Sequence, residues 1–112
     1  MEDYYKLIHE GVNMDFANEK GQTPLMKVST LNNHTLLKLV IKQTTQINAE
    51  DEDGNSALYY AVEANDVDAV RILFEHGAKI TDFIYMMALH NKRKKIVEFF
   101  DRQDSNKEVF LK

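Results

Sequence analysis

The amino-acid sequence repeats itself at a spacing of 33 residues, and this period constrains the fold more than any other property of the chain. A displacement of 33 brings Gly21 onto Gly54 and Asn32 onto Asn65. The apolar run of the first copy also falls on that of the second, Leu37-Lys38-Leu39-Val40-Ile41 on Val70-Arg71-Ile72-Leu73-Phe74. A fixed period of roughly 20–50 residues indicates that each copy forms one supersecondary unit and that neighbouring units stack.

The units differ in length. The register predicts a half unit at residues 3–16, full units at 17–49 and 50–81, a shortened unit at 82–103 and a tail at 104–112. Between the second full unit and the last, the register changes, because Ala61-Val62 matches Ala88-Leu89 at a spacing of 27. Six residues are therefore missing around positions 81–83, and we expect the last unit to lack the hairpin connector of the others.

Each full unit carries signals for two short helices. Thr23-Pro24 predicts the start of an inner helix, with Thr as the N-cap and Pro where its missing N–H costs nothing. Asn32-Asn33, like Asn65-Asp66, ends that helix, because these side chains compete for backbone hydrogen bonds and tolerate turn geometry. The apolar run that follows predicts an outer helix, and Gly77 supplies a left-handed C-cap. Such a helix pair cannot bury its own apolar face, so stacking completes the core.

These motifs resemble ankyrin repeats over roughly residues 5–100. The family opens its first helix with Asp-x-x-Gly-x-Thr-Pro-Leu-His, and Asn18–Met26 and Asp51–Tyr59 match that opening. His76–Ile80 matches the exit of the second helix, and Ile47–Ala49 matches the end of the hairpin. The resemblance implies a single all-α domain over residues 1–112, a solenoid of stacked helix-turn-helix units with short β-hairpin or turn connectors.

The sequence departs from the family pattern at several positions. Met26 and Tyr59 stand where the family has His, so we expect an altered hydrogen-bond network there. Thr44 replaces the Gly at a helix exit, and a β-branched residue in a left-handed cap costs about 1 kcal/mol or more, so this exit should be rebuilt or loosened. The first helix, near Asp3 to Glu10, has no partner helix in the chain.

Composition and motifs exclude several classes of function. The net charge of −4 disfavours a general nucleic-acid binder, and the absence of cysteine excludes disulfides and thiolate chemistry. The four histidines lack metal-ligand spacing and should have ordinary surface roles, so no metal or cofactor is expected. Gly54 fails as the central glycine of a calcium loop, because Ala49 and Tyr60 would fill its first and last ligand positions. We expect a non-enzymatic, cytoplasmic protein, with the nucleus as the alternative location.

The resemblance also implies where a partner binds, namely on the concave surface formed by hairpin tips and the exposed side of the inner helices. Ala17 lies at a tip as well, and Asp51 is left out because the family's Asp supports the turn. The predicted partner-binding residues are Glu19, Lys20, Gln22, Thr30, Leu31, Glu50, Glu52, Asp53, Asn55, Tyr59, Glu63, Ala64, His90 and Asn91.

Charge gives this surface two interpretations. Glu50, Glu52, Asp53 and Glu63 would attract a Lys/Arg-rich peptide, or the tips are acidic only for solubility, which the sequence alone favours. The basic run Lys92–Lys95 is better explained as a solvated terminal cap than as an import signal or a phosphate contact.

Two functions follow. The leading hypothesis is a protein–protein interaction module that binds a segment of another protein. The alternative is a structural fragment of a larger array, or a homo-oligomer that mates through its incomplete N-terminal end, where Leu7 and Ile8 would otherwise lack neighbours.

Overall fold

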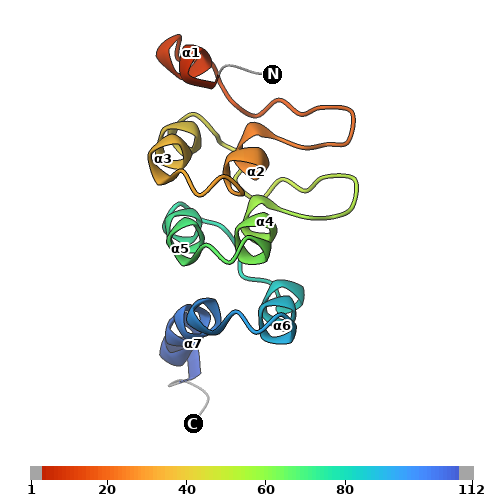
Figure 1. The fold of residues 1–112 in the computed structure, drawn as a ribbon, viewed down its shortest axis with the longest axis vertical. Coiled ribbons are helices and arrows are strands. Elements are labelled where there is room, and N and C mark those ends of the chain that lie inside the picture. Colours follow the sequence, from red (N-terminus) through yellow and green to blue (C-terminus); the bar gives the residue numbers. More distant parts are fainter. Residues whose placement is uncertain (1–3, 109–112) are drawn as a thin grey trace.

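The computed structural model describes the backbone of residues 4–108 and the side chains of residues 4–103. Within that range the chain forms helices that alternate between two columns (Figure 1). The inner column holds α2, α4 and α6, and the outer column holds α1, α3, α5 and α7. Their bounds are α1 Tyr4–His9, α2 Pro24–Val28, α3 His34–Lys42, α4 Ala57–Glu63, α5 Val67–Glu75, α6 Asp82–His90 and α7 Lys94–Glu108.

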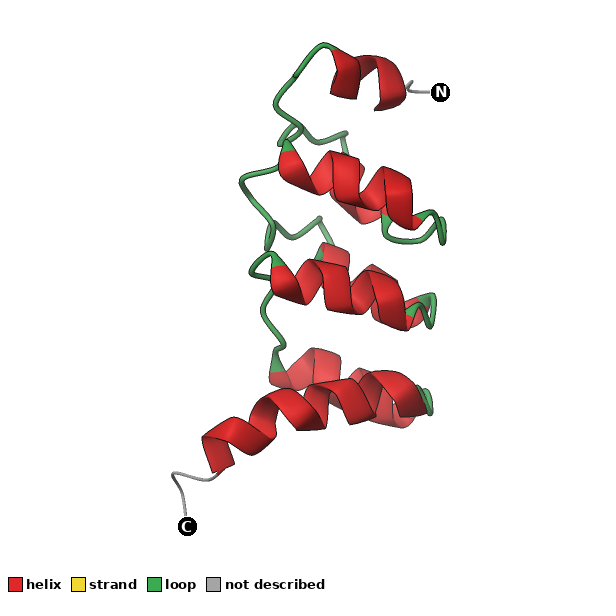
Figure 2. Ribbon diagram, turned by 90° about the vertical axis from the view of Figure 1, so that its left-hand side faces the viewer, coloured by secondary structure: helices red, strands yellow, loops and turns green. Residues whose placement is uncertain are grey.

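The expected all-α solenoid is confirmed. The molecule measures 49 × 23 × 21 Å, and its helix layers follow one another along the long axis (Figure 2). No residue in the range 4–108 belongs to a strand, so turns build the connectors that the family pattern draws as β-hairpins. Two long loops extend beside α2 and α4 in Figure 1, the first hairpin at residues 10–23 and the second hairpin at residues 43–56.

The helix starts follow from capping side chains. The Thr23 and Ser56 hydroxyls accept hydrogen bonds from the third helical N–H at 3.3 and 3.4 Å, and Thr81 does the same for α6 at 3.2 Å. Asn33 and Asp66 cap α3 and α5 in the same way. Each such bond satisfies a helix N–H that has no partner within the helix.

The breaks between inner and outer helices confirm the sequence interpretation. Asn32 and Asn65 adopt left-handed backbone angles, with φ of 55° and 57°. Lys92 adopts φ of 58° at the matching place in the last unit. Asn tolerates this region because its short polar side chain bonds locally, whereas Lys has no such advantage.

One hydrophobic core runs the length of the stack. α4 packs against α2, α5 and α6, so the second full unit is covered on both sides. The aliphatic residues Leu58, Val62 and Leu73 of this unit are almost completely buried. Core Leu and Ile residues of α3 and the two Phe residues of α7 are buried as well. Since every unit contributes to its neighbour's interior, no helix pair is independent of the others.

The exit of α3 confirms the expectation that the chain at Thr44 is rebuilt or loosened. Thr44 is absent from the residues with left-handed angles, so no β-branched residue carries that strain. Its side chain is buried, and its hydroxyl donates to the Val40 carbonyl at 2.8 Å. The chain leaves α3 through Gln43, whose φ is −106°, and the Gln43 carbonyl accepts from the Met14 N–H. The exit is therefore rebuilt rather than loosened.

The last unit lacks the hairpin, as the change in register predicts. The chain passes from Gly77 to the N-cap Thr81 and directly into α6. The outer helix α7 continues to Glu108, so it includes residues 104–108 of the expected tail. The remainder of that tail, residues 109–112, lies outside the described range.

Candidate partner-binding surface

The second hairpin tip is organised by Asp51. One carboxylate oxygen accepts from the backbone N–H groups of Asp53 and Asn55, both at 3.0 Å. The other accepts from the Tyr60 hydroxyl. Burial opposes ionisation of this carboxyl, but these hydrogen bonds outweigh it and lower the pKa of Asp51. Asp51 is thus a supporting residue of the turn, as the family pattern implies.

The two hairpins contact each other through their backbones. The Glu52 N–H donates to the Lys20 carbonyl at 2.9 Å. Close by, a Cβ on Gly21 would lie 3.1 Å from the Asp51 Cα and 3.2 Å from the Glu52 nitrogen. Gly21 has φ of +78°, so a glycine is favoured here by its backbone conformation and by the limited space.

The predicted partner-binding residues are accessible. Gln22, Asn55 and Tyr59 are half-buried and the others are exposed, including Leu31 with 54% of its surface exposed. In the described part of the chain, none of the four predicted acidic residues of the second unit forms an ion pair. Those four carboxylates, Glu50, Glu52, Asp53 and Glu63, therefore remain available for a cation from outside.

Tyr59 lies among these carboxylates. Its hydroxyl donates to Glu63 at 3.3 Å, and its ring stacks on Phe83 with 6.1 Å between centroids and 12° between planes. Burial raises the pKa of Tyr59, and the nearby charge of Glu63 raises it further, with smaller contributions from Asp51 and Asp53. The direction of these effects indicates that the ring lies in a negative environment.

Phe83 was missed by the sequence interpretation. It is 63% exposed, and Met86, one turn later on α6, is 61% exposed. The sequence signal for a difference in this region was the spacing of 27. Counted back from the equivalent residues Ala88 and Ala61, α6 begins two residues earlier than α4. The additional N-terminal residues place Phe83 in the first turn of α6, where the register of the last unit differs from that of the full units.

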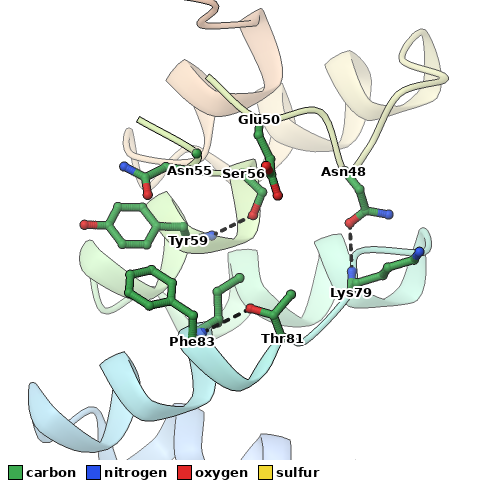
Figure 3. A pocket seen from close by; sticks show the side chains of 10 residues that line it. Asn48, Glu50, Asn55, Ser56, Tyr59, Lys79, Thr81 and Phe83 are labelled. Atoms are coloured by element: carbon green, nitrogen blue, oxygen red, sulfur yellow. Dashed lines mark hydrogen bonds between the residues drawn. The ribbon is translucent and has the colours of Figure 1, made fainter. Parts of the chain in front are cut away.

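A small pocket of about 80 Å³ lies where the third hairpin is missing (Figure 3). Tyr59 and Phe83 lie side by side at this pocket, and Glu50 lies above them in the view. We call it the hairpin notch; it is lined by Asn48, Glu50, Gly54, Asn55, Ser56, Tyr59, Lys79, Thr81, Phe83 and Ile84. It thus brings three predicted residues together with residues that were not predicted.

The substitutions at the family's His position have separate outcomes. The Met26 sulfur accepts from the Thr23 N–H at 3.4 Å, a weak bond that closes the capping box of α2. Tyr59 instead directs its hydroxyl to Glu63. The altered hydrogen-bond network therefore leaves an aromatic ring on the concave surface of the second unit.

The basic run is not uniformly solvated, which corrects the description of Lys92–Lys95 as a simple cap. Arg93 is half-buried and donates to the Glu63 carbonyl at the end of α4, at 2.8 Å. Lys92, Lys94 and Lys95 are exposed. Arg93 occupies the place that Asn33 and Asp66 hold in the other units, where a guanidinium cannot accept an N-cap bond.

His34 also has more than a surface role. Its Nε2 lies 2.8 and 2.9 Å from the two Asp66 oxygens, and this contact joins the first full unit to the second. Ligand atoms of His34, Asp66 and Asp68, one from each, lie within 4.8 Å of one another, a group that sequence spacing alone overlooked. These atoms already have protein partners, since Asp66 caps α5 and Asp68 pairs with Arg71 at 2.7 Å. A cation would have to displace those bonds.

Comparison with known proteins agrees with this architecture. A family model described as ankyrin repeats, in three copies, matches residues 2–84. The chain is 34% identical over 74 residues to the human transient receptor potential cation channel subfamily A member 1, covering 65% of this chain and 7% of that protein. It is 33% identical over 72 residues to mouse neurogenic locus notch homolog protein 1, covering 64% of this chain and 3% of the relative.

A third similar protein, a putative ankyrin repeat protein of Acanthamoeba polyphaga mimivirus, is 24% identical over 75 residues, which are 67% of this chain and 10% of that protein. The chain thus corresponds to a small part of each of these relatives. Among residues 4–108, no helix has the combined length and apolarity needed to span a bilayer.

Proposed function

The chain belongs to the ankyrin repeat family, and on that premise we propose that it is a non-catalytic module that binds a segment of another protein on its concave surface. Ankyrin repeats generally mediate protein–protein interaction. The observation that carries the proposal is the exposed set of carboxylates around Tyr59, which form no ion pair within the described residues. A partner segment rich in Lys or Arg complements this set in charge.

In this proposal the carboxylates and the aromatic ring contribute to binding in different ways. Exposed carboxylates steer a basic segment and set its orientation, mainly through the association rate. Aromatic side chains supply contact area at a low cost in conformational entropy, because few bonds must be fixed. Tyr59 combines both, since its ring is accessible and its hydroxyl is held by Glu63.

The test is a pull-down from the native cell with the intact chain and a charge-reversed variant. Glu52→Lys together with Glu63→Lys should abolish or strongly weaken partner capture. The matched control is Glu10→Lys with Glu75→Lys, which makes the same change in net charge at exposed positions in the outer column. Equal capture by both double variants would rule out the acidic surface.

The alternative of assembly through the N-terminal end also has an observation in its favour. α1 contains no fully buried residue, and Tyr5 is 53% exposed. Leu7 and Ile8 are half-buried, because α3 covers one side of α1 only. A second copy or a preceding repeat would cover the other side. Analytical ultracentrifugation at micromolar concentration tests this, and a monomer would exclude self-assembly.

A further inference from the structure

We propose that the hairpin notch is the docking site for an extended segment of the partner protein, which takes the place of the missing third hairpin. In this arrangement a backbone N–H of the segment donates to the Asp53 carbonyl, and an Arg or Lys side chain lies against Tyr59 and Phe83 and faces Glu50. The inference rests on the proposed function and specifies which part of the concave surface binds and what chemistry it recognises.

The first argument is a backbone hydrogen bond between the two hairpins that has no counterpart one unit later. The Lys20 carbonyl of the first hairpin accepts from the Glu52 N–H of the second, at 2.9 Å. Asp53 stands 33 residues after Lys20, so its carbonyl occupies the same position one unit later. Among the described residues no donor reaches the Asp53 carbonyl, because the last unit has no hairpin. An extended segment with a free N–H would supply the donor that the Asp53 carbonyl lacks.

The second argument is the space left beside the second hairpin. Gly21 is crowded by the following hairpin, whose backbone approaches to 3.1 Å of a Cβ built there. Gly54 has nearly the same backbone angle, with φ of +80°, but a Cβ built on it meets nothing within 4 Å. Two glycines in matching positions thus have a covered and an uncovered environment. Gly54 lines the notch, so the uncovered place is the notch itself.

The third argument is the chemistry of the side chains around this space. Phe83 exposes 63% of its surface and stacks on Tyr59, which forms an aromatic platform from two units. Glu50 lines the same pocket, and the Asp53 carboxylate is exposed on the adjoining turn. An Arg or Lys side chain satisfies both features, because its cation is attracted by aromatic faces and by carboxylates.

Lys79 is the one cation among the described lining residues, and its backbone N–H donates to the Asn48 side chain at 2.8 Å. Its side chain lies at the far side of the pocket from Tyr59 in Figure 3. The carboxylates on the hairpin outnumber it. The notch therefore favours a segment whose basic residue lies at the aromatic side.

The experiment is selection of a random peptide library, displayed on phage, against the intact chain. Selected peptides should carry a basic residue and should bind Phe83→Ser and Glu50→Lys about tenfold or more weakly than the unmodified chain. Matched controls are Phe16→Ser, also an exposed apolar residue, and Glu75→Lys in the outer column; neither is among the predicted partner-binding residues, and both should bind as the unmodified chain does. All four positions are exposed, so folding should be retained, which circular dichroism checks.

The backbone contact has its own test in the selected peptides. N-methylation of each peptide bond in turn removes one N–H at a time, and one position should lose about tenfold or more in affinity. If no single methylation lowers the affinity, the proposed backbone hydrogen bond to the Asp53 carbonyl is ruled out.

The outcomes separate this inference from the proposed function. If Glu63→Lys or Leu31→Ser weakens peptide binding and Phe83→Ser does not, binding on the concave surface is supported and docking in the hairpin notch is ruled out. Failure to select any binding peptide would count against both. Self-association that Phe83→Ser abolishes would show that a second copy occupies the notch and would overturn the partner segment.

Discussion

The junction between the two full units and the junction between the second full unit and the last differ mainly on the hairpin side. At the first junction, backbone meets backbone, because Gly21 packs closely on Asp51 and the hairpins share a hydrogen bond. At the second, no hairpin follows; the rings of Tyr59 and Phe83 stack, and the Asn48 side chain bonds to the backbone that leads into α6. Yet α4 packs against both α2 and α6. The helices maintain the stack, whereas the hairpins determine what surface it presents.

The glycine pair tests this comparison with the largest expected effect. Gly21→Ala should destabilise the protein by about 2–3 kcal/mol, since left-handed strain of about 1–2 kcal/mol adds to a tight contact with the Asp51 backbone, which would have to shift. Gly54→Ala should cost only the strain, about 1–2 kcal/mol, and so less than Gly21→Ala. Urea unfolding of the two variants measures the difference. Equal losses would mean that the two hairpins are equally crowded.

The turn-supporting residues should show a smaller difference. Asp51→Ala should cost about 2 kcal/mol, because it leaves two backbone N–H groups and the Tyr60 hydroxyl without their acceptor. Asn18→Ala, at the matching position of the first hairpin, removes the acceptor of the Lys20 and Gln22 N–H groups and an exposed bond to the Gln22 side chain, and should cost about 1 kcal/mol. Urea midpoints at neutral pH provide the measurement, and the reverse order would contradict the role of the Tyr60 contact.

Acid should remove part of the contribution that Asp51 makes to the stability of the folded protein. Hydrogen bonds keep the pKa of Asp51 below its ordinary value of 3.8 in the folded protein, despite the opposing effect of burial. Its stabilising contribution is therefore complete above that ordinary value and is lost as the pH falls through the lower, folded pKa. Asp15 has a lowered pKa for similar reasons and follows the same direction. Unfolding free energy measured from about pH 6 to pH 2 should fall more steeply for the unmodified chain than for Asp51→Asn.

The second junction should respond least to loss of its Arg93 contact. Arg93→Met removes the hydrogen bond to the Glu63 carbonyl, but it also removes an Nε group that is buried without a partner. The two effects oppose each other, so we expect a loss of about 0.5 kcal/mol. Lys92→Met is the control at an exposed position with a left-handed angle, and it should leave the free energy of unfolding nearly unchanged. A loss above about 2 kcal/mol for Arg93→Met would show that this contact is a main support of the junction.

Much of the fold could be predicted because its signals are local. Thr23-Pro24, Asn32 and Asn65 encode caps and left-handed turns within a few residues, and the period of 33 specifies how such turns recur. Thr44 was harder, because the family pattern assigns a left-handed angle that the chain avoids through Gln43. The bond from the Gln43 side chain to the Val12 carbonyl joins residues that are far apart in sequence, so no local pattern predicts it.

Part of the candidate site could be predicted from local sequence, and part could not. Its acidic tip residues follow from the family positions, and the structure places them on the exposed surface. Phe83 could not be assigned in this way, because it lies in the part of the last unit that departs from the repeat. The contact of Arg93 with Glu63 and that of His34 with Asp66 likewise join neighbouring units, and only a three-dimensional arrangement brings them together.

The sequence alone determined the repeat, the order of helices and the loss of the third hairpin, because each depends on residue identity at short range and on a regular period. The tertiary structure alone decided what that loss produces. The last unit is six residues shorter, and a shift of α6 toward the second hairpin would have closed the space that the third hairpin leaves. Instead α6 remains stacked on α4, because burial of its core residues Ile84 and Ala88 stabilises that position. The gap therefore persists as an exposed pocket beside Tyr59 and Phe83.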